Sequence, residues 1–253
     1  MSERSRVKGE RVVIDYAATQ AFFDARGRRQ YASPLNATMY QDNDPELVKQ
    51  RDLAEKAVLA PLLKIDSGSS VLDIGCGVGR WGWFLSERAS NIDYVGIDFS
   101  ASLIEKAQEE ALQLGLSQLN FQTMSAITIK PEELFVTPPY DLILISGLLI
   151  YLNDEDCSKV LADASRLCAA NGLIYIREPV GISERFTLDR FYSSELSQEY
   201  SAIYRTVDEL HILFDQAFAG DMFEEKVSDF LFPESLEKRV ETRQYYIVLQ
   251  RRG

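Results

Sequence analysis

Short apolar runs recur along the chain from residue 71 onward, and several of them are separated by segments in which apolar positions have helical spacing. The runs lie at 71–74, 94–97, 119–123, 140–145 and 173–176. Continuous apolar strands that alternate with helices indicate a parallel sheet that is covered on both faces. Two further runs, 223–232 and 244–250, are joined by a connection too short for a crossover helix, so we expect an antiparallel pair. The pattern therefore predicts an α/β fold with a mostly parallel seven-stranded sheet and an antiparallel C-terminal strand.

Two helices of this pattern have recognisable boundaries. The first follows Gly79 and carries Trp81 and Leu85. The second begins after Ser100, a residue type that caps helix N-termini, and ends at Gly115, a residue type that favours the left-handed backbone of a helix end. Both helices are predicted to cover the sheet.

Two segments lie outside this alternation. Residues 16–63 have a helical pattern whose first part is rich in aromatic and arginine residues, and residues 179–220 form a long insert after the fifth strand. We expect helices in the insert, where Thr206 and Glu209 have the spacing of a capping box. The predicted organisation is an N-terminal helical cover over 1–63 and a main domain over 64–253, with a lid insert at 179–220.

Composition narrows the classes of partner. The chain has 253 residues, 46% of them hydrophobic, which suits one α/β domain with a lid. A net charge of −12 would repel a phosphate backbone, so the sequence favours a small-molecule partner over nucleic acid. There is no apolar run of membrane-spanning length and no signal-peptide pattern, which predicts a soluble, cytoplasmic protein without a membrane partner. Cys76, Cys157 and Cys168 lack metal-site spacing and are interpreted as reduced structural thiols, so no metal is expected.

The candidate ligand-binding residues begin at the end of the first strand. Asp73 is followed by three glycines at alternate positions, Gly75, Gly77 and Gly79, which allow a tight turn and a close approach to a ligand. Asp98 ends the next strand, at the position from which carboxylates bind ribose hydroxyls in nucleotide sites. A dinucleotide motif would place its third glycine at position 80, which is Arg80 here, and this disfavours a nicotinamide-dependent reductase. The pattern predicts a nucleoside ligand without a pyrophosphate.

These motifs, together with 140–142 and 152–154, resemble the class I S-adenosylmethionine-dependent methyltransferases of the small-molecule type, over about 71–177 and the C-terminal strand pair. The resemblance implies a Rossmann-like methyltransferase fold with S-adenosylmethionine as cofactor. It implies that Asp73 attracts the ammonium group of the cofactor and that Asp98 accepts hydrogen bonds from its ribose. The other residues that it places around the cofactor are Gly75, Cys76, Gly77, Phe99, Ser125, Ala126 and Ser146.

Candidate catalytic residues come from the cover and from strand ends. Methyl transfer is an in-line displacement in which positioning can supply most of the catalysis, and aromatic faces stabilise a sulfonium by about 1 to 2 kcal/mol when desolvated. Tyr16, Tyr151 and Tyr204 are therefore candidates for the reaction chamber. Glu178, at the end of the fifth strand, lies by topology on the substrate side.

The favoured function is methyl transfer to nitrogen or oxygen of a small molecule, in specialised metabolism. One alternative uses S-adenosylmethionine as the sole substrate and cyclises it to azetidine-2-carboxylate, with release of methylthioadenosine. A second alternative is a non-catalytic partner protein that binds the cofactor. The sequence predicts neither the acceptor nor the oligomeric state.

Overall fold

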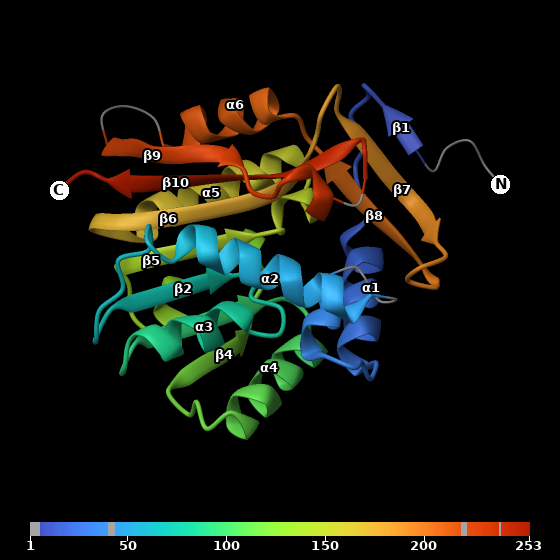
Figure 1. Ribbon diagram of the computed structural model, residues 1–253. Coiled ribbons are helices and arrows are strands. Elements are labelled where there is room, and N and C mark those ends of the chain that lie inside the picture. Colours follow the sequence, from blue (N-terminus) through green and yellow to red (C-terminus); the bar gives the residue numbers. More distant parts are fainter. Residues whose placement is uncertain (1–5, 40–43, 219–221, 238) are drawn as a thin grey trace.

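The computed structural model describes residues 6–39, 44–218, 222–237 and 239–253, so small parts of the predicted cover and insert lie outside the described residues. Its main sheet has seven strands in the order β4-β3-β2-β5-β6-β10-β9 (Figure 1). The strands are parallel from β4 to β6, and β10 is antiparallel to both of its neighbours. Their bounds are β2 (Ser70–Ile74), β3 (Asp93–Asp98), β4 (Leu119–Thr123), β5 (Tyr140–Ser146), β6 (Cys168–Gly181), β9 (Phe223–Phe230) and β10 (Thr242–Arg251). The predicted α/β sheet is confirmed.

Helices cover both faces of this sheet. On one face lie α2 (Pro45–Leu59), α3 (Arg80–Arg88) and α4 (Ala101–Gln113), and on the other α5 (Asp154–Leu167) and α6 (Val207–Ala217). The side chains of β5 alternate between the two cores: Leu142 and Leu144 pack with the first group of helices, and Ile143 and Ile145 pack with the second. This burial on both faces explains why the strands of the sequence are continuously apolar.

The predicted helix ends are confirmed. The Ser100 side chain accepts a hydrogen bond from the backbone of Leu103 at the start of α4, and Gly115 has a left-handed φ of 71° just after its end. At α6, Thr206 and Glu209 form a capping box in which each side chain bonds the backbone of the other residue.

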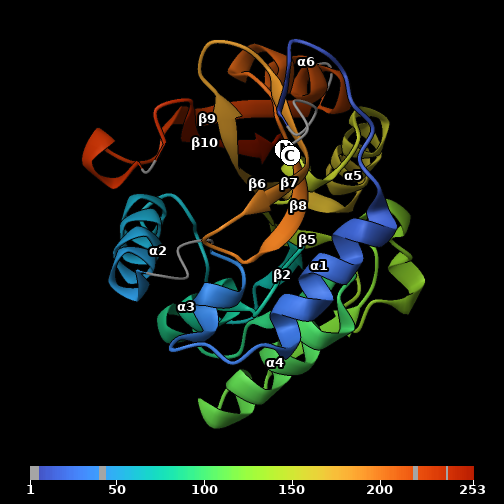
Figure 2. The same ribbon diagram turned by 90° about the vertical axis from the view of Figure 1, so that its right-hand side faces the viewer.

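A second, smaller sheet forms a cover with α1 (Tyr16–Arg28) at the carboxyl ends of the parallel strands (Figures 1 and 2). It contains β1 (Arg6–Lys8), β7 (Phe186–Ser193) and β8 (Gln198–Tyr204), in the antiparallel order β1-β7-β8. The expectation that helices fill the insert is therefore wrong for residues 186–204, which form a hairpin, and α6 is the helix found in it. The N-terminal segment and the insert are joined in one sheet, and the boundary at residues 63 and 64 stays a prediction.

Aromatic side chains attach the cover to the main domain. Within the cover, Phe22 of α1 stacks on Tyr200 of β8 with ring centroids 5.8 Å apart. Phe23 of α1 contacts the main domain, because its ring and that of Tyr151 meet in a T-shaped arrangement with centroids 4.9 Å apart. Such pairs contribute about 0.5 to 1.5 kcal/mol each beyond the area that they bury. The apolar cluster of the cover also contains Val78, Leu103, Ile150 and Tyr151, so the cover is packed onto the main domain.

In the part of the chain that the structure describes, no helix combines the length and the apolar character needed to span a bilayer. The three cysteines are buried and form no disulfide.

Candidate active site

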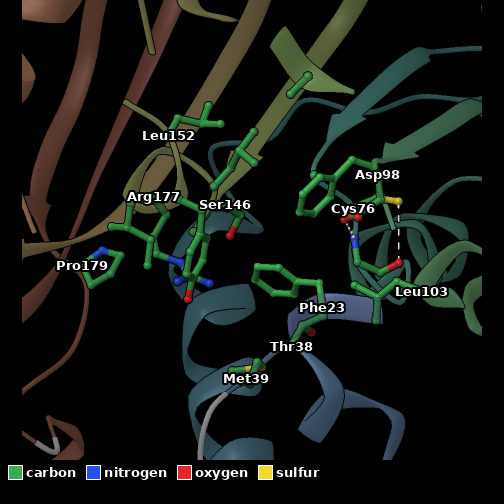
Figure 3. A pocket seen from close by; sticks show the side chains of 18 of the residues that line it. Phe23, Thr38, Met39, Cys76, Asp98, Leu103, Ser146, Leu152, Arg177 and Pro179 are labelled. Atoms are coloured by element: carbon green, nitrogen blue, oxygen red, sulfur yellow. Dashed lines mark hydrogen bonds between the residues drawn. The ribbon is translucent and has the colours of Figure 1, made fainter. Parts of the chain in front are cut away.

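A cavity of about 610 Å³ lies between the carboxyl ends of the parallel strands and the cover. Figure 3 shows Cys76, Asp98 and Leu103 on one side of it and Arg177 and Pro179 on the other, with Phe23, Thr38 and Met39 along a third. The cavity therefore has two ends, which we name by their residues. The cofactor end contains Asp73, Gly75, Gly77 and Asp98, and the arginine end contains Arg51, Arg177 and Arg239.

The glycine loop forms part of the wall of the cavity at the cofactor end. Gly75, Gly77 and Gly79 all have left-handed φ values, of 74°, 56° and 82°. A Cβ at Gly77 would lie 2.6 Å from the Thr38 side chain, and one at Gly79 would lie 2.5 Å from the ring of Phe121. Both conformation and space therefore require glycine here.

Asp98 is held in place by the backbone around it. One of its carboxylate oxygens accepts a hydrogen bond from the N–H of Ser100 at 2.9 Å, and the other accepts one from the N–H of Gly77 at 3.1 Å. Burial raises the pKa of Asp98 to about 6, although these two hydrogen bonds act in the opposite direction. The carboxylate lines the cavity and connects the glycine loop to the start of α4.

Asp73 is almost completely buried at the end of β2 and also lines the cavity. Its carboxylate accepts a hydrogen bond from the Tyr94 hydroxyl at 2.8 Å. Burial raises the pKa of Asp73 to about 7, and the Tyr94 hydrogen bond and the charge of Arg80 oppose that rise. A buried carboxylate of this kind gains from a cationic ligand, because the ligand offsets the cost of its desolvation.

The other predicted cofactor residues also line the cavity; they are Cys76, Phe99, Ser125, Ala126 and Ser146. Ser146 lies opposite Arg177 in the sheet, nearer to the arginine end. The ring of Phe99 also meets that of Phe23 from the cover, with centroids 5.8 Å apart. The structure brings these residues together around one space, and their contacts with a cofactor stay predictions.

Arg80 occupies the middle of a buried ionic network that the sequence did not reveal. Its guanidinium contacts Asp52 at 2.9 Å, Glu55 at 2.8 Å and the Ser146 hydroxyl at 2.8 Å. Glu55 is fully buried and also pairs with Arg177 at 3.2 Å. Burial alone would raise the pKa of Glu55, but the charges of Arg177 and Arg80 lower it to about 2. The three-residue spacing of Asp52 and Glu55 on a helix was the available signal, because it places both on one face.

The candidate tyrosines all line the cavity, and the hydroxyls of Tyr16 and Tyr204 are held by hydrogen bonds. The Tyr16 hydroxyl donates to Asp156 at 2.5 Å and accepts from the backbone of Asn153 at 2.9 Å. The Tyr204 hydroxyl accepts a hydrogen bond from Arg239 at 3.0 Å. Burial raises the pKa of both hydroxyls far above the usual range, so neither suits proton abstraction. Tyr151 presents a buried side chain beside Phe23.

Glu178 has a different position from the one expected. It is buried and is not one of the residues that line the cavity. Its carboxylate accepts backbone N–H groups of Leu148, Leu149 and Ile150 at 2.9, 2.8 and 3.2 Å. Burial raises its pKa to about 7 against these hydrogen bonds. This placement supports a positioning role for the loop after β5 and gives no support to direct substrate contact.

Among the described residues, no group of three or more histidine, cysteine, aspartate or glutamate side chains could hold a metal ion. The residues present instead fit S-adenosylmethionine. The buried carboxylates of Asp73 and Asp98 line the cavity and have the charge that an ammonium group and ribose hydroxyls would require, and the glycine loop leaves a space that Cβ atoms would fill.

Two features define a Rossmann-like methyltransferase domain. The first is a parallel sheet of this strand order with an antiparallel strand pair, and the second is a glycine loop and an acidic residue at the ends of adjacent strands. Comparison with known proteins agrees, because residues 65–231 match the family model described as "Methyltransferase domain". The chain belongs to this family, and the predicted resemblance to class I S-adenosylmethionine-dependent methyltransferases is confirmed.

Curated relatives include two phosphoethanolamine N-methyltransferases. The protein from Caenorhabditis elegans is 30% identical over 145 residues, which cover 57% of this chain and 28% of that protein. The protein from Triticum aestivum is 30% identical over 130 residues, covering 51% and 25%. The chain therefore spans about a quarter of the length of these relatives.

Solved structures share the fold. Magnesium protoporphyrin IX methyltransferase from Synechocystis, solved with bound S-adenosylmethionine, has a TM-score of 0.64 at 16% identity and covers 96% of this chain and 99% of its own. Phosphoethanolamine N-methyltransferase 1 from Haemonchus contortus has a TM-score of 0.66 at 22% identity, covering 94% of this chain and 49% of its own.

Proposed function

We propose that this protein transfers the methyl group of S-adenosylmethionine to a nitrogen or oxygen atom of a small molecule. The observation that carries the proposal is the single cavity that joins the glycine loop and Asp98 to a second, polar end lined by Arg51, Arg177 and Arg239. One end suits a nucleoside with an amino-acid tail, and the other leaves space for an acceptor. A purely cofactor-binding protein would not need that second end.

The residues of the cofactor end have distinct tasks in this proposal. Asp98 accepts ribose hydroxyl groups, Asp73 attracts an ammonium group, and the Phe99 ring packs against adenine near Ser125 and Ala126. When bound, S-adenosylmethionine supplies an electrophilic methyl group on a sulfonium. The chain's own contribution is to orient the two ligands and to exclude water.

The aromatic side chains of the cover contribute to that environment. Phe23, Tyr16 and Tyr151 line the cavity, and their faces favour a positive charge by about 1 to 2 kcal/mol when water is excluded. The fixed hydroxyls of Tyr16 and Tyr204 make positioning a better-supported role for these residues than acid–base chemistry. We therefore propose that the acceptor enters with its lone pair already available.

A nitrogen acceptor is favoured by the sequence relatives, which are named as N-methyltransferases. The net charge of −12 continues to favour a small molecule over nucleic acid. The biosynthetic role in specialised metabolism and the cytoplasmic location remain part of the proposal.

Product analysis tests the reaction. The full chain is incubated with S-adenosylmethionine, with and without phosphoethanolamine or ethanolamine, and the nucleoside products are separated by chromatography. Formation of S-adenosylhomocysteine that depends on the acceptor supports methyl transfer. Methylthioadenosine without any acceptor would support the cyclisation alternative. Calorimetry that detects no S-adenosylmethionine binding would contradict both.

The Asp98→Ala variant tests the cofactor assignment. We expect cofactor affinity to fall by about 1 to 3 kcal/mol, because hydrogen bonds to a charged group are lost. Asp93→Ala is the matched control, since Asp93 is an exposed carboxylate on the same strand. Equal affinity of the two variants by calorimetry would refute the role of Asp98.

A further inference from the structure

Among the described residues, the arginine end of the cavity contains a cation, Arg239, whose charge no carboxylate balances by direct contact. Arg51 pairs with Glu237 at 3.1 Å, and Arg177 pairs with Glu55 at 3.2 Å. Among the described residues, no carboxylate lies within ion-pair distance of Arg239, although this arginine lines the same cavity.

The partners of Arg239 are two phenols from β8. Its guanidinium donates to the Tyr204 hydroxyl at 3.0 Å and to the Tyr200 hydroxyl at 3.2 Å, and both tyrosine side chains are buried. Burial raises the pKa of Tyr204 far above its usual range, so this phenol stays neutral at physiological pH. These hydrogen bonds fix the direction of the guanidinium without cancelling its charge.

Neighbouring carboxylates do not supply the missing charge. Glu237 is two residues away, but its oxygens are bound to Arg51 and to the backbone N–H of Gln244 at 2.9 Å. Glu195 also lines the cavity, and among the ion pairs of the described residues none joins it to Arg239. A guanidinium remains charged at every physiological pH, and partial removal from water without an anionic partner is costly.

We propose that Arg239, oriented by Tyr204, binds an anionic group of the acceptor, either a carboxylate or a phosphate. The planar fork of arginine suits both groups, because each presents two oxygens that can accept parallel hydrogen bonds. This inference rests on the proposed function and adds the class of acceptor to it. The reacting atom would then lie between Arg239 and the cofactor end of the same cavity.

Binding of simple anions tests the subsite without cofactor or turnover. Thermal unfolding of the full chain is measured with inorganic phosphate or with acetate, at constant ionic strength with chloride as the reference. The wild type is compared with Arg239→Gln and with Arg243→Gln, a matched control because Arg243 follows on the same segment but does not line the cavity.

We expect phosphate or acetate to raise the Tm of the wild type and of Arg243→Gln, and we expect that rise to disappear in Arg239→Gln. The anion that gives the larger rise identifies the group. Equal responses of all three proteins, or no response of the wild type to either anion, would overturn the proposal. If circular dichroism shows that Arg239→Gln folds poorly, Tyr204→Phe replaces it as the test variant. Tyr204→Phe keeps the aromatic ring and the charge of Arg239 but removes the hydroxyl that orients the guanidinium, so we expect the anion-induced rise in Tm to be smaller than in the wild type.

A second measurement separates this proposal from the proposed function. By calorimetry, phosphoethanolamine or γ-aminobutyrate should bind the wild type at least about tenfold more tightly than ethanolamine, the gain expected from a charged hydrogen-bonded contact. Arg239→Gln should abolish the difference. If S-adenosylhomocysteine forms in the presence of an acceptor but the anionic compounds bind no more tightly than ethanolamine, the anion subsite at Arg239 is overturned and the proposed methyl transfer is not. Failure to bind S-adenosylmethionine would overturn the proposed function and leave the anion result standing.

Discussion

Replacing Arg80 with methionine should destabilise the folded protein by about 3 to 5 kcal/mol. The guanidinium is 7% exposed and contacts Asp52, Glu55 and Ser146 at 2.8 to 2.9 Å. Asp52 would retain Lys56 at 2.6 Å, but the fully buried Glu55 would lose one of its two cationic partners. Breaking a buried ion pair from one side typically costs this much, because an uncompensated charge remains. For a chain of this size the loss corresponds to a fall in Tm of roughly 6 to 20 °C.

Urea unfolding followed by circular dichroism measures the loss. Arg88→Met is the control, since Arg88 is an exposed arginine on the same helix, and its effect should stay below about 1 kcal/mol. Adding Glu55→Gln to Arg80→Met should recover part of the stability, because the buried charge is then removed together with its partner. A loss below about 1 kcal/mol for Arg80→Met, or no recovery in the double variant, would refute the argument.

The pH dependence of the Arg80→Met variant gives a second check on the same reasoning. The pKa of Glu55 is about 2 in the folded protein, below its ordinary value, so its ion pairs add stability above pH 4.5 that disappears as the pH falls toward 2. The stability difference between the wild type and Arg80→Met should therefore shrink as the pH is lowered through that window. A difference that is constant with pH would mean that the loss is one of packing.

Two further predictions concern the cofactor end. The pKa values of Asp73 and Asp98 are raised to about 7 and about 6, so both carboxyl groups are largely protonated in the free protein at pH 5. The affinity for S-adenosylmethionine should therefore rise between pH 5 and 8, and binding near pH 6.5 should release protons. Calorimetry in buffers of different ionisation enthalpy measures this release, and a pH-independent affinity would contradict it. The same raised pKa values mean that these two groups lower the stability of the free protein as the pH rises from 4 to 7. Gly79→Ala should lower the free energy of unfolding in urea by more than about 1 kcal/mol, because the new Cβ would lie 2.5 Å from the Phe121 ring at a residue with a left-handed φ. Gly115→Ala is the control for backbone strain alone, since Gly115 has a similar φ and open space around it. Equal losses of stability in the two variants would exclude a steric contribution at Gly79.

The main sheet and the cofactor end could be predicted because their signals are local. Each parallel strand is a continuous apolar run, and the helix caps at Ser100 and Thr206 lie within a few residues of the groups that they cap. The glycine loop and Asp98 are likewise fixed by positions at the ends of adjacent strands. Local sequence determines such features, so they need no knowledge of distant partners.

The hairpin of the cover was missed because its signal is interrupted. The pairing of β7 with β8 shifts register between Leu188 and Phe191, and Arg190 within this bulge has a left-handed φ of 48°. The bulge breaks the two-residue alternation by which a strand is recognised. The arginine end was missed for another reason: Arg51, Arg177 and Arg239 come from three separate segments, and only the folded chain brings them to one cavity.

The pairing of β1 with β7 also sets an order on the assembly of the molecule. Arg6 lies opposite Leu188, so the first described strand has no partner until most of the chain has been synthesised. The parallel strands that carry the glycine loop and Asp98 are contiguous in sequence and depend on closer contacts, which form sooner than distant ones. The cofactor end of the cavity can therefore take shape on the nascent chain before the small sheet of the cover is complete.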